Sequence, residues 1–221
     1  MSTVVVKLGG AVAVDSAGAI LALARRHRVC VVHGAGPQIS AEMSRLGIPV
    51  EFVGGRRVTS AQGLEVVRRC LAAVNADVCA MLGELAVPLI GDEIGLRATR
   101  VPELGLVGEA VASRPPAVVR WLAAGRIPVV APLAVGPLNV NADDAAAALA
   151  IGLRAERLHF LSDVPGLLLG GTVAGSVEAA EAERLLETGA LVGGIVPKLH
   201  AAIAAARGGV EAEIGTTAVL V

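Results

Sequence analysis

Short β-branched runs that alternate with segments of helical periodicity constrain this fold more than any other sequence feature. Apolar runs at 4–8, 29–33 and 158–161 have the length and residue types of buried strands. Between the runs lie segments with apolar residues three and four positions apart, as in helices that cover a core. Alternating strands and helices predict an α/β fold, a three-layer sandwich whose central sheet is mainly parallel with helices on both faces.

The expected elements extend over the whole chain, without internal repeats, low-complexity segments or an obvious linker. Helices are expected at 17–27, 37–46, 62–85, 116–124, 142–153, 179–187 and 196–207. Strands are expected at 4–8, 29–33, 128–131, 158–161, 211–214 and 218–221, with small strands or hairpins between 87 and 108.

Composition narrows the class of protein. The 221 residues are 54% hydrophobic with a net charge of −1, which argues against disorder. Charged residues or prolines interrupt every apolar run that could span a membrane. Nucleic-acid binding would need a basic face and stacking aromatic residues, which this chain lacks. The three cysteines form no CxxC pair and the first residues lack a signal peptide's basic start, so we expect a cytoplasmic protein.

The two lysines stand out because the chain uses arginine for nearly all its cations, with 17 arginines. Lys7 lies in VVVKLGGAV and Lys198 in GGIVPKLHAA, both beside glycines. A lysine is a compact point charge on a flexible stem, which arginine cannot replace where that shape matters. Both are candidate catalytic residues, although two lysines could also persist by chance.

Other candidate residues lie where predicted strands end, the edge at which open α/β sheets bind ligands. In VVHGAGPQIS, residues 34–36 form either a plain turn or a cradle for an anion. LNVNADDAAAALA places Asp143 in a first helical turn, where capping is the simpler explanation, but capping explains Asn139 and Asn141 less well. In LSDVPGLL, Asp163 could equally be an ordinary turn residue. Arg57 in GRRVT suits a fork-like grip on a carboxylate.

Common nucleotide-binding signatures are absent or incomplete. The sequence has no GxxxxGK[ST] motif, so a P-loop protein is not expected. HGAG supplies a GxG step, but Ile39 stands where a third glycine would complete a Rossmann fingerprint. A Rossmann fold is therefore a weak alternative.

Six motifs together resemble the amino acid kinase family, and within it the N-acetylglutamate kinases: VVVKLGGAV, VVHGAGPQIS, GRRVT, LNVNADDAAAALA, LSDVPGLL and GGIVPKLHAA. They occur in the family's order and cover the chain nearly end to end. The resemblance implies one domain, with an amino-terminal lobe at about 1–153 for the acyl amino acid and a carboxy-terminal lobe at about 154–221 for ATP. It implies transfer of the ATP γ-phosphate to the side-chain carboxylate of N-acetyl-L-glutamate, in arginine biosynthesis, with Mg²⁺ held by ATP.

The resemblance also assigns roles to individual residues. Lys7 and Lys198 would stabilise the transition state, and Asp143 would hold the lysines in place. The substrate would be bound by Gly34, Ala35, Gly36, Arg57 and Asn139. The nucleotide would be bound by Gly9, Gly10, Asp163, Val164, Pro165, Gly166, Leu167, Leu168, Ala190, Leu191 and Val192. A carboxylate is already ionised at neutral pH, so no general base is needed.

Two residues depart from the family pattern. Ala35 replaces the usual glycine, so either its φ is ordinary or the pocket is altered. Val192 stands where a polar residue is common, which weakens the adenosine assignment.

One alternative function is a kinase for carrier-bound aminoadipate or glutamate in lysine biosynthesis, for which Arg56 is the only hint of a basic rim. A second is a non-catalytic amino-acid sensor, which would not require both lysines and Asp143.

The resemblance further implies a homodimer, closed by two-fold symmetry through the helix expected at 62–85. Arginine-inhibited members of the family carry an extra helix before the first strand, which links dimers into a hexamer. Because the first strand here is expected by about Val4, we expect neither that hexamer nor strong inhibition by arginine.

Overall fold

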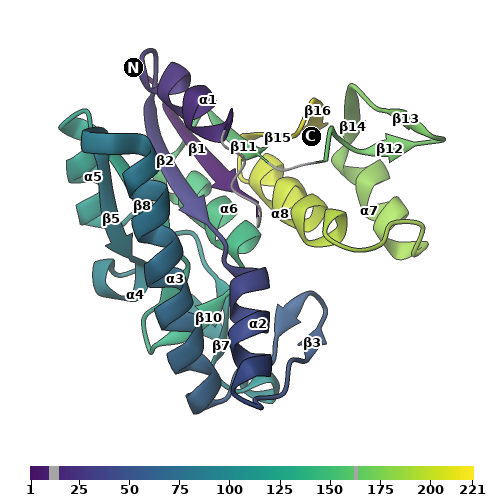
Figure 1. Ribbon diagram of the computed structural model, residues 1–221. Helices are drawn as coiled ribbons and strands as arrows, with labels where there is room; N and C mark the ends of the chain where they lie inside the picture. The colour runs from purple at the N-terminus through teal and green to yellow at the C-terminus, as the bar shows by residue number, and fades with distance from the viewer. Residues whose placement is uncertain (10–14, 162–163) are drawn as a thin grey trace.

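A mixed eight-stranded sheet forms the centre of the computed structural model, which describes residues 1–9, 15–161 and 164–221 (Figure 1). Neighbouring strands run parallel, except that β15 and β16 are antiparallel. The strand order is β14 (Ser176–Glu178), β16 (Thr217–Leu220), β15 (Glu211–Ile214), β11 (Arg157–Leu161), β1 (Thr3–Leu8), β2 (Arg28–His33), β8 (Ile127–Ala131) and β5 (Ala86–Ile90).

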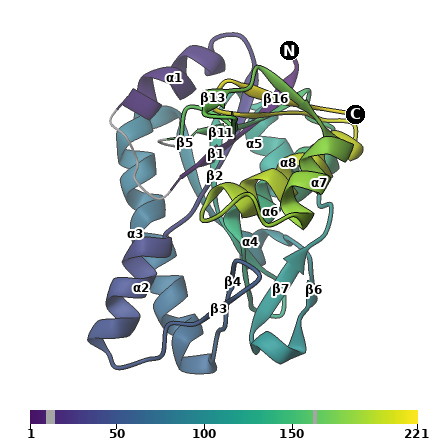
Figure 2. The same ribbon diagram turned by 90° about the vertical axis from the view of Figure 1, so that its right-hand side faces the viewer.

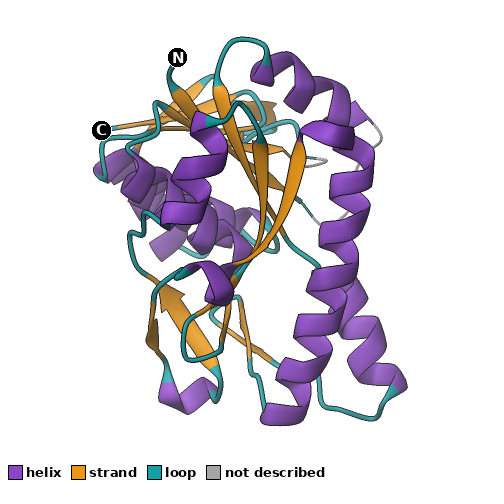
Figure 3. Cartoon of the chain, turned by 90° about the vertical axis from the view of Figure 1, so that its left-hand side faces the viewer, coloured by secondary structure: helices purple, strands orange, loops and turns teal. Residues whose placement is uncertain are grey.

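Helices cover both faces of this sheet, which confirms the predicted three-layer α/β sandwich (Figures 2 and 3). Along β1, Val4 and Val6 pack with one helical layer and Val5 with the other, because side chains alternate along a strand. One layer contains α1 (Asp15–Ala24), α2 (Gly36–Arg45) and α3 (Ala61–Leu82). The other contains α5 (Pro116–Ala123), α6 (Ala142–Leu153), α7 (Ala179–Glu187) and α8 (Ile195–Arg207).

Smaller elements extend from the carboxyl end of the central sheet or flank it. A four-stranded sheet has the order β6 (Ala98–Arg100), β7 (Val107–Ala110), β10 (Leu138–Val140) and β9 (Leu133–Ala134). Two hairpins are β3 (Phe52–Val53) with β4 (Arg56–Arg57), and β12 (Leu168–Leu169) with β13 (Thr172–Val173). The short helices are η1 (Gly83–Leu85), α4 (Gly91–Ile94) and η2 (Pro102–Leu104).

The hairpin β3–β4 occupies a segment that the sequence analysis treated as a glycine loop. Gly54 and Gly55 both have positive φ, 54° and 76°. Two such residues between paired strands make the turn that matches the strand twist in a tight hairpin. Each strand has only two residues, too few to display an alternating pattern, so Arg57 lies in a strand rather than a loop.

Element boundaries differ from the predictions by a few residues. The helix expected at 62–85 ends at Leu82, because Gly83 takes a φ of 68° and starts a separate 3₁₀ turn. The helix expected at 17–27 spans 15–24, and the last strand lies at 217–220 instead of 218–221. None of the helices in the described ranges combines the length and apolar character needed to cross a membrane.

Candidate active site

A cavity of about 360 Å³ lies at the carboxyl ends of β1 and β2, the edge at which parallel sheets bind ligands. It is bordered by the turn after β2, the hairpin β3–β4, the amino terminus of α6 and the first turns of α8. Every residue predicted for catalysis or substrate binding lines this cavity: Lys7, Gly34, Ala35, Gly36, Arg57, Asn139, Asp143 and Lys198. Their roles are not tested by this placement and stay predictions.

Lys7 and Asp143 form a buried ion pair at this cavity. Strand alternation directs Lys7 toward the layer that contains α6, the same side as Val5. Lys7 Nζ lies 2.7 Å from Asp143 Oδ1, and both side chains are less than one tenth exposed. A buried charge is costly unless it is paired, so each side chain fixes the other in place.

Lys198 approaches the cavity from the first turns of α8. Its Nζ donates a hydrogen bond to the carbonyl of Gly194, the residue that precedes the helix, at 3.1 Å. Lys198 is partly exposed, whereas Lys7 is buried. Two ammonium groups therefore border one cavity from separate elements, although 190 residues of sequence divide them.

The turn after β2 lines the cavity with Gly34, Ala35 and Gly36. Gly36 begins α2, so its N–H has no partner inside the helix. Within the described ranges, neither Ala35 N–H nor Gly36 N–H donates to another backbone group outside the helices and strands. Ala35 has a φ of −145°, a value that does not require glycine. Alanine therefore fits the turn with an ordinary φ.

Arg57 is held tightly by its neighbours in α2 and β3. Its Nη2 donates to Ser40 Oγ at 2.8 Å and to the Gly36 carbonyl at 3.1 Å. The guanidinium carbon lies 4.5 Å from the centre of the Phe52 ring, a cation–π contact. Burial lowers the pKa of Arg57, yet a guanidinium stays charged at physiological pH. The result is a fixed cation beside the 34–36 turn.

Asn139, predicted to bind the same carboxylate as Arg57, lies in β10 on another wall of the cavity. Its Nδ2 donates to Thr59 Oγ1 at 3.0 Å, and Thr59 Oγ1 donates to the Arg57 carbonyl at 2.7 Å. The chain of hydrogen bonds ties the backbone of Arg57 to β10. Sequence reasoning did not single out Thr59, which is fully buried.

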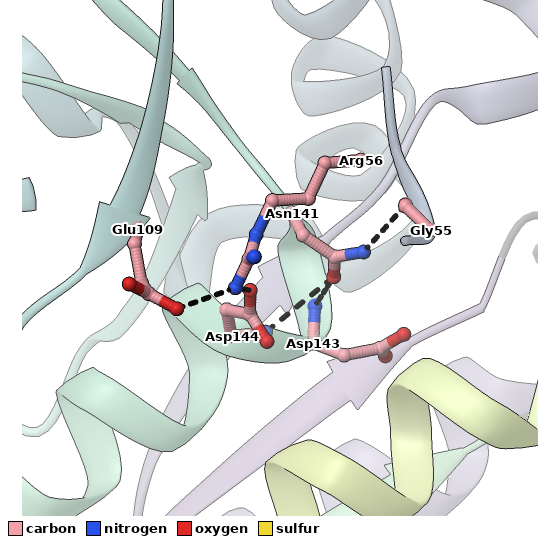
Figure 4. Close-up of polar contacts among 6 residues, drawn as sticks. All are labelled: Gly55, Arg56, Glu109, Asn141, Asp143 and Asp144. Carbon is pink, nitrogen blue, oxygen red and sulfur yellow. Dashed lines mark hydrogen bonds and ion pairs between the residues drawn. The ribbon is translucent and has the colours of Figure 1, made fainter. Parts of the chain in front are cut away.

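A second polar cluster, which the sequence analysis did not assign to the site, clamps the hairpin β3–β4 to α6 (Figure 4). Asn141 caps α6 by accepting from Asp143 N–H at 2.8 Å, and its amide donates to the Gly55 carbonyl at 3.3 Å. Arg56 Nη2 lies 2.8 Å from Glu109 Oε1 and 3.2 Å from Asp144 Oδ2. Burial raises the pKa of Asp144, and Arg56 opposes that rise.

The signal for this cluster was only partly present in the sequence. The expectation that capping explains Asn141 less well is wrong, because its side chain accepts from the N–H groups of Asp143 and Asp144. The contact between Arg56 and Glu109 joins residues 53 positions apart, and no local pattern links them. Topology alone brings them together.

The described residues among those predicted to bind the nucleotide do not line the cavity. Gly9 follows β1 and donates to the Leu161 carbonyl at 2.8 Å, and Leu167 N–H donates to Thr217 Oγ1 at 2.9 Å. Leu168 is 53% exposed and Val192 is 80% exposed. Of the other predicted nucleotide contacts, Gly166 is buried, Val164 and Leu191 are partly exposed, and Pro165 and Ala190 are exposed. Gly10 and Asp163 lie outside the described residues.

Comparison with known proteins gives a consistent assignment. The model of the amino acid kinase family matches residues 2–216. An acetylglutamate kinase of Rubrobacter xylanophilus is 44% identical over 97% of this chain and 88% of its own length. An acetylglutamate kinase of Frankia casuarinae is 42% identical over 95% of this chain, which spans 65% of that relative.

A solved structure supports the fold. The crystal structure of smu.665 from Streptococcus mutans UA159 has a TM-score of 0.89, with 24% identity, over 99% of this chain and 98% of that chain. At that identity the likeness concerns the fold alone. Together with the family match over nearly the whole sequence, these comparisons show that the chain belongs to the amino acid kinase family.

Proposed function

We propose that this protein transfers the γ-phosphate of ATP to the side-chain carboxylate of N-acetyl-L-glutamate, forming an acyl phosphate in arginine biosynthesis. The observation that carries the proposal is the convergence of Lys7, Lys198, Arg57 and the 34–36 turn on one cavity. Relatives named acetylglutamate kinase, at 42–44% identity over most of the chain, support the same reaction.

The acceptor is bound through groups that already face the cavity. Arg57 and Asn139 hold the α-carboxylate of N-acetyl-L-glutamate, and the N–H groups of Ala35 and Gly36 hold the reacting end. A carboxylate has an ordinary pKa of about 4.3, so it is ionised at neutral pH and attacks without a general base. The new bond joins a carboxylate oxygen to the γ-phosphorus, while the bond from that phosphorus to the bridging oxygen of ADP breaks.

The lysines neutralise the charge that spreads over the transferring phosphoryl group. Such reactions depend on alignment and electrostatic stabilisation more than on covalent chemistry. Lys7 is preorganised by Asp143 at 2.7 Å, so it needs little rearrangement during the reaction. Lys198 provides a second ammonium from α8.

Magnesium enters with the nucleotide in this proposal. The donor set of the cavity is mainly cationic and amide, and its one buried carboxylate, Asp143, is paired with Lys7. Such a set suits phosphate oxygens better than a bare cation, and Mg²⁺ is commonly held by substrate phosphates. When bound, the ion would neutralise charge on those phosphates.

The surroundings of Arg56 favour a small acceptor over a carrier-bound one. A basic rim for an acidic carrier protein would need free cationic groups at the cavity mouth. Arg56 instead lies within 3.2 Å of two carboxylates, those of Glu109 and Asp144. Its charge is therefore compensated within the chain.

The proposal is tested by an acceptor screen with purified protein. ADP release and trapping of the acyl phosphate with hydroxylamine would be measured for N-acetyl-L-glutamate, N-acetyl-L-aspartate, N-acetyl-L-aminoadipate and free glutamate. We expect turnover to be highest with N-acetyl-L-glutamate. Preference for a longer side chain would support the aminoadipate alternative, and no turnover with any acceptor would refute the kinase activity.

Assembly and location complete the proposal. We propose a cytoplasmic homodimer with α3 at the contact. Light scattering would test the dimer, because it should report twice the 22.1 kDa mass of one chain. A mass of 22.1 kDa at micromolar concentration would contradict it.

A further inference from the structure

His33 is a fully buried titratable residue beside the candidate site, and the proposed reaction does not use it. It is the last residue of β2 and immediately precedes the 34–36 turn. Its ring contacts Asn75, a buried residue in the middle of α3. The pair links a helix of one layer to the turn that borders the cavity.

The orientation of the Asn75 amide is fixed by the backbone of β8. Asn75 Nδ2 lies 2.9 Å from the Val129 carbonyl, which can only accept. The group at that position must therefore be the NH₂ of the amide and not its oxygen. The same NH₂ lies 3.0 Å from His33 Nε2. The two shortest contacts of this NH₂ are thus with Val129 and His33, and a longer one, 3.5 Å, reaches the Leu89 carbonyl.

This arrangement determines the tautomer of His33. Nε2 accepts from Asn75, so in the neutral ring the proton is on Nδ1. Nδ1 lies 3.4 Å from the Gly34 carbonyl, which accepts a hydrogen bond from it. Burial, with a smaller contribution from Lys7, lowers the pKa of His33 to about 4, so the ring is neutral at physiological pH.

The Gly34–Ala35 peptide is thereby held at one end. The described chain has no cis peptide bond, and in a trans peptide the carbonyl and the following N–H point in opposite directions. With the Gly34 carbonyl turned toward His33, the N–H of Ala35 points away from the imidazole. Ala35 itself lines the cavity.

We propose that His33 and Asn75 are positioning residues, which orient the Gly34–Ala35 peptide so that Ala35 N–H is presented to the acceptor carboxylate. The inference rests on the proposed function, because it concerns the acceptor of that reaction. Asn75 acts through His33, by selecting its tautomer, and neither side chain touches the substrate.

Kinetics of four variants test the proposal. Asn75→Leu removes the donor that fixes the tautomer, and His33→Leu removes the contact with Gly34. Both should raise the KM for N-acetyl-L-glutamate about tenfold while the KM for ATP changes less than about twofold. His33→Asn should restore much of the affinity, because its amide can place an N–H near the position of Nδ1. Val78→Ala is the matched control, since Val78 is also buried in α3 and carries no polar group.

The outcomes separate this inference from the proposed function. A wild-type protein without activity on N-acetyl-L-glutamate would refute the function. An active wild type whose Asn75→Leu and His33→Leu variants bind the acceptor like Val78→Ala would refute the positioning role. Equal rises in both KM values would also refute it, because a general loss of structure does not distinguish the two substrates.

Ring-nitrogen NMR gives a readout that needs no activity and no folded variant. The chain has four histidines, and His33 is the fully buried one among them. At pH 7 its ring should carry the proton on Nδ1. A proton on Nε2 would overturn the proposal even if every variant failed to fold.

Discussion

The region that we propose for the acceptor and the region that we propose for the nucleotide, here called the acceptor side and the nucleotide side, are built differently. On the acceptor side, Lys7, Arg57 and Asn139 are already bound to other groups of the chain, and two of the three are buried. On the nucleotide side, the segments around 164–168 and 190–192 contain few polar side chains, and Leu168 and Val192 are exposed. The first region is preorganised before any ligand binds, whereas the second offers turns and aliphatic surface.

The difference suggests where each ligand obtains its specificity. Fixed donors in a buried site interact strongly with charge, because little reorganisation is needed when the ligand arrives. An exposed aliphatic surface contributes in proportion to the area that the ligand covers, and it discriminates poorly between ligands. Single substitutions should therefore have large effects on the acceptor side and small effects on the nucleotide side.

The largest effect is expected at the lysines. Lys7→Arg and Lys198→Arg should each lower kcat at least about a hundredfold, because an arginine fork cannot occupy a site shaped for an ammonium. Initial rates at saturating ATP and N-acetyl-L-glutamate would measure this. Only Lys7→Arg should also lower the Tm, since Lys7 is buried and Lys198 is partly exposed. Near-normal kcat in either variant would remove that lysine from the mechanism.

Arg57 should show the next largest effect. Arg57→Ala removes a charged group that we assign to the α-carboxylate, away from the reacting atoms, so it should raise the KM for N-acetyl-L-glutamate roughly 10- to 100-fold. The KM for ATP should change little. Arg45→Ala is a suitable control, because Arg45 is exposed and forms an ion pair with Glu42 in the same helix, α2. A rise in the KM for ATP alone would show that Arg57 acts on the nucleotide and that our assignment of it to the acceptor is wrong.

The acceptor side was easier to predict from the sequence, because it contains charged side chains and the nucleotide side has few polar ones. Lys7, Asp143 and the 34–36 turn were recognisable because charged residues and glycines are rare in apolar, strand-ending segments. Lys7 and the 34–36 turn converge because β1 and β2 are parallel neighbours whose carboxyl ends share one edge, a property of the fold class. Asp143 instead follows β10 of the separate four-stranded sheet, so this rule does not explain its position. The clamp of Arg56 on Glu109 and Asp144 was not predictable, because it depends on a hairpin whose two-residue strands leave no pattern.

The contact between His33 and Asn75 shows a second limit. From the sequence, Asn75 looks like any polar residue in a long helix, because its partner His33 is 42 positions away. Only the packing of α3 over β2 and β8 reveals that its amide links a carbonyl to an imidazole. Sequence patterns identify groups that carry charge, but not the neutral groups that orient them.

Acid should weaken folding through His33, a fully buried imidazole beside the 34–36 turn on the acceptor side. Its pKa is about 4 in the folded chain and near 6.5 when unfolded, so only the unfolded state gains a proton between these values. Stability is complete above pH 6.5 and falls as the pH decreases toward 4. At pH 5 the loss is about 2 kcal/mol.

Urea unfolding of wild type and His33→Asn at pH 7.5 and pH 5 would measure this loss. The variant should lose about 2 kcal/mol less than wild type over the interval. Groups that titrate in the same way in both proteins cancel in the difference. Equal losses in both proteins would show that His33 is not kept neutral by the fold.

The smallest effect is expected on the nucleotide side, at Val192. Its side chain is 80% exposed, so it packs little against the chain, and removing two methyl groups should cost at most the ~0.8 kcal/mol per carbon of full burial under the ligand. We expect Val192→Ala to raise the KM for ATP about two- to fivefold and to leave the KM for N-acetyl-L-glutamate unchanged. Val135→Ala is the control, because Val135 is also exposed and lies far from the 190–192 segment in sequence. A hundredfold loss of ATP affinity at Val192 would break the comparison, because it would mean that a single aliphatic side chain on the nucleotide side contributes as much as a buried cation on the acceptor side.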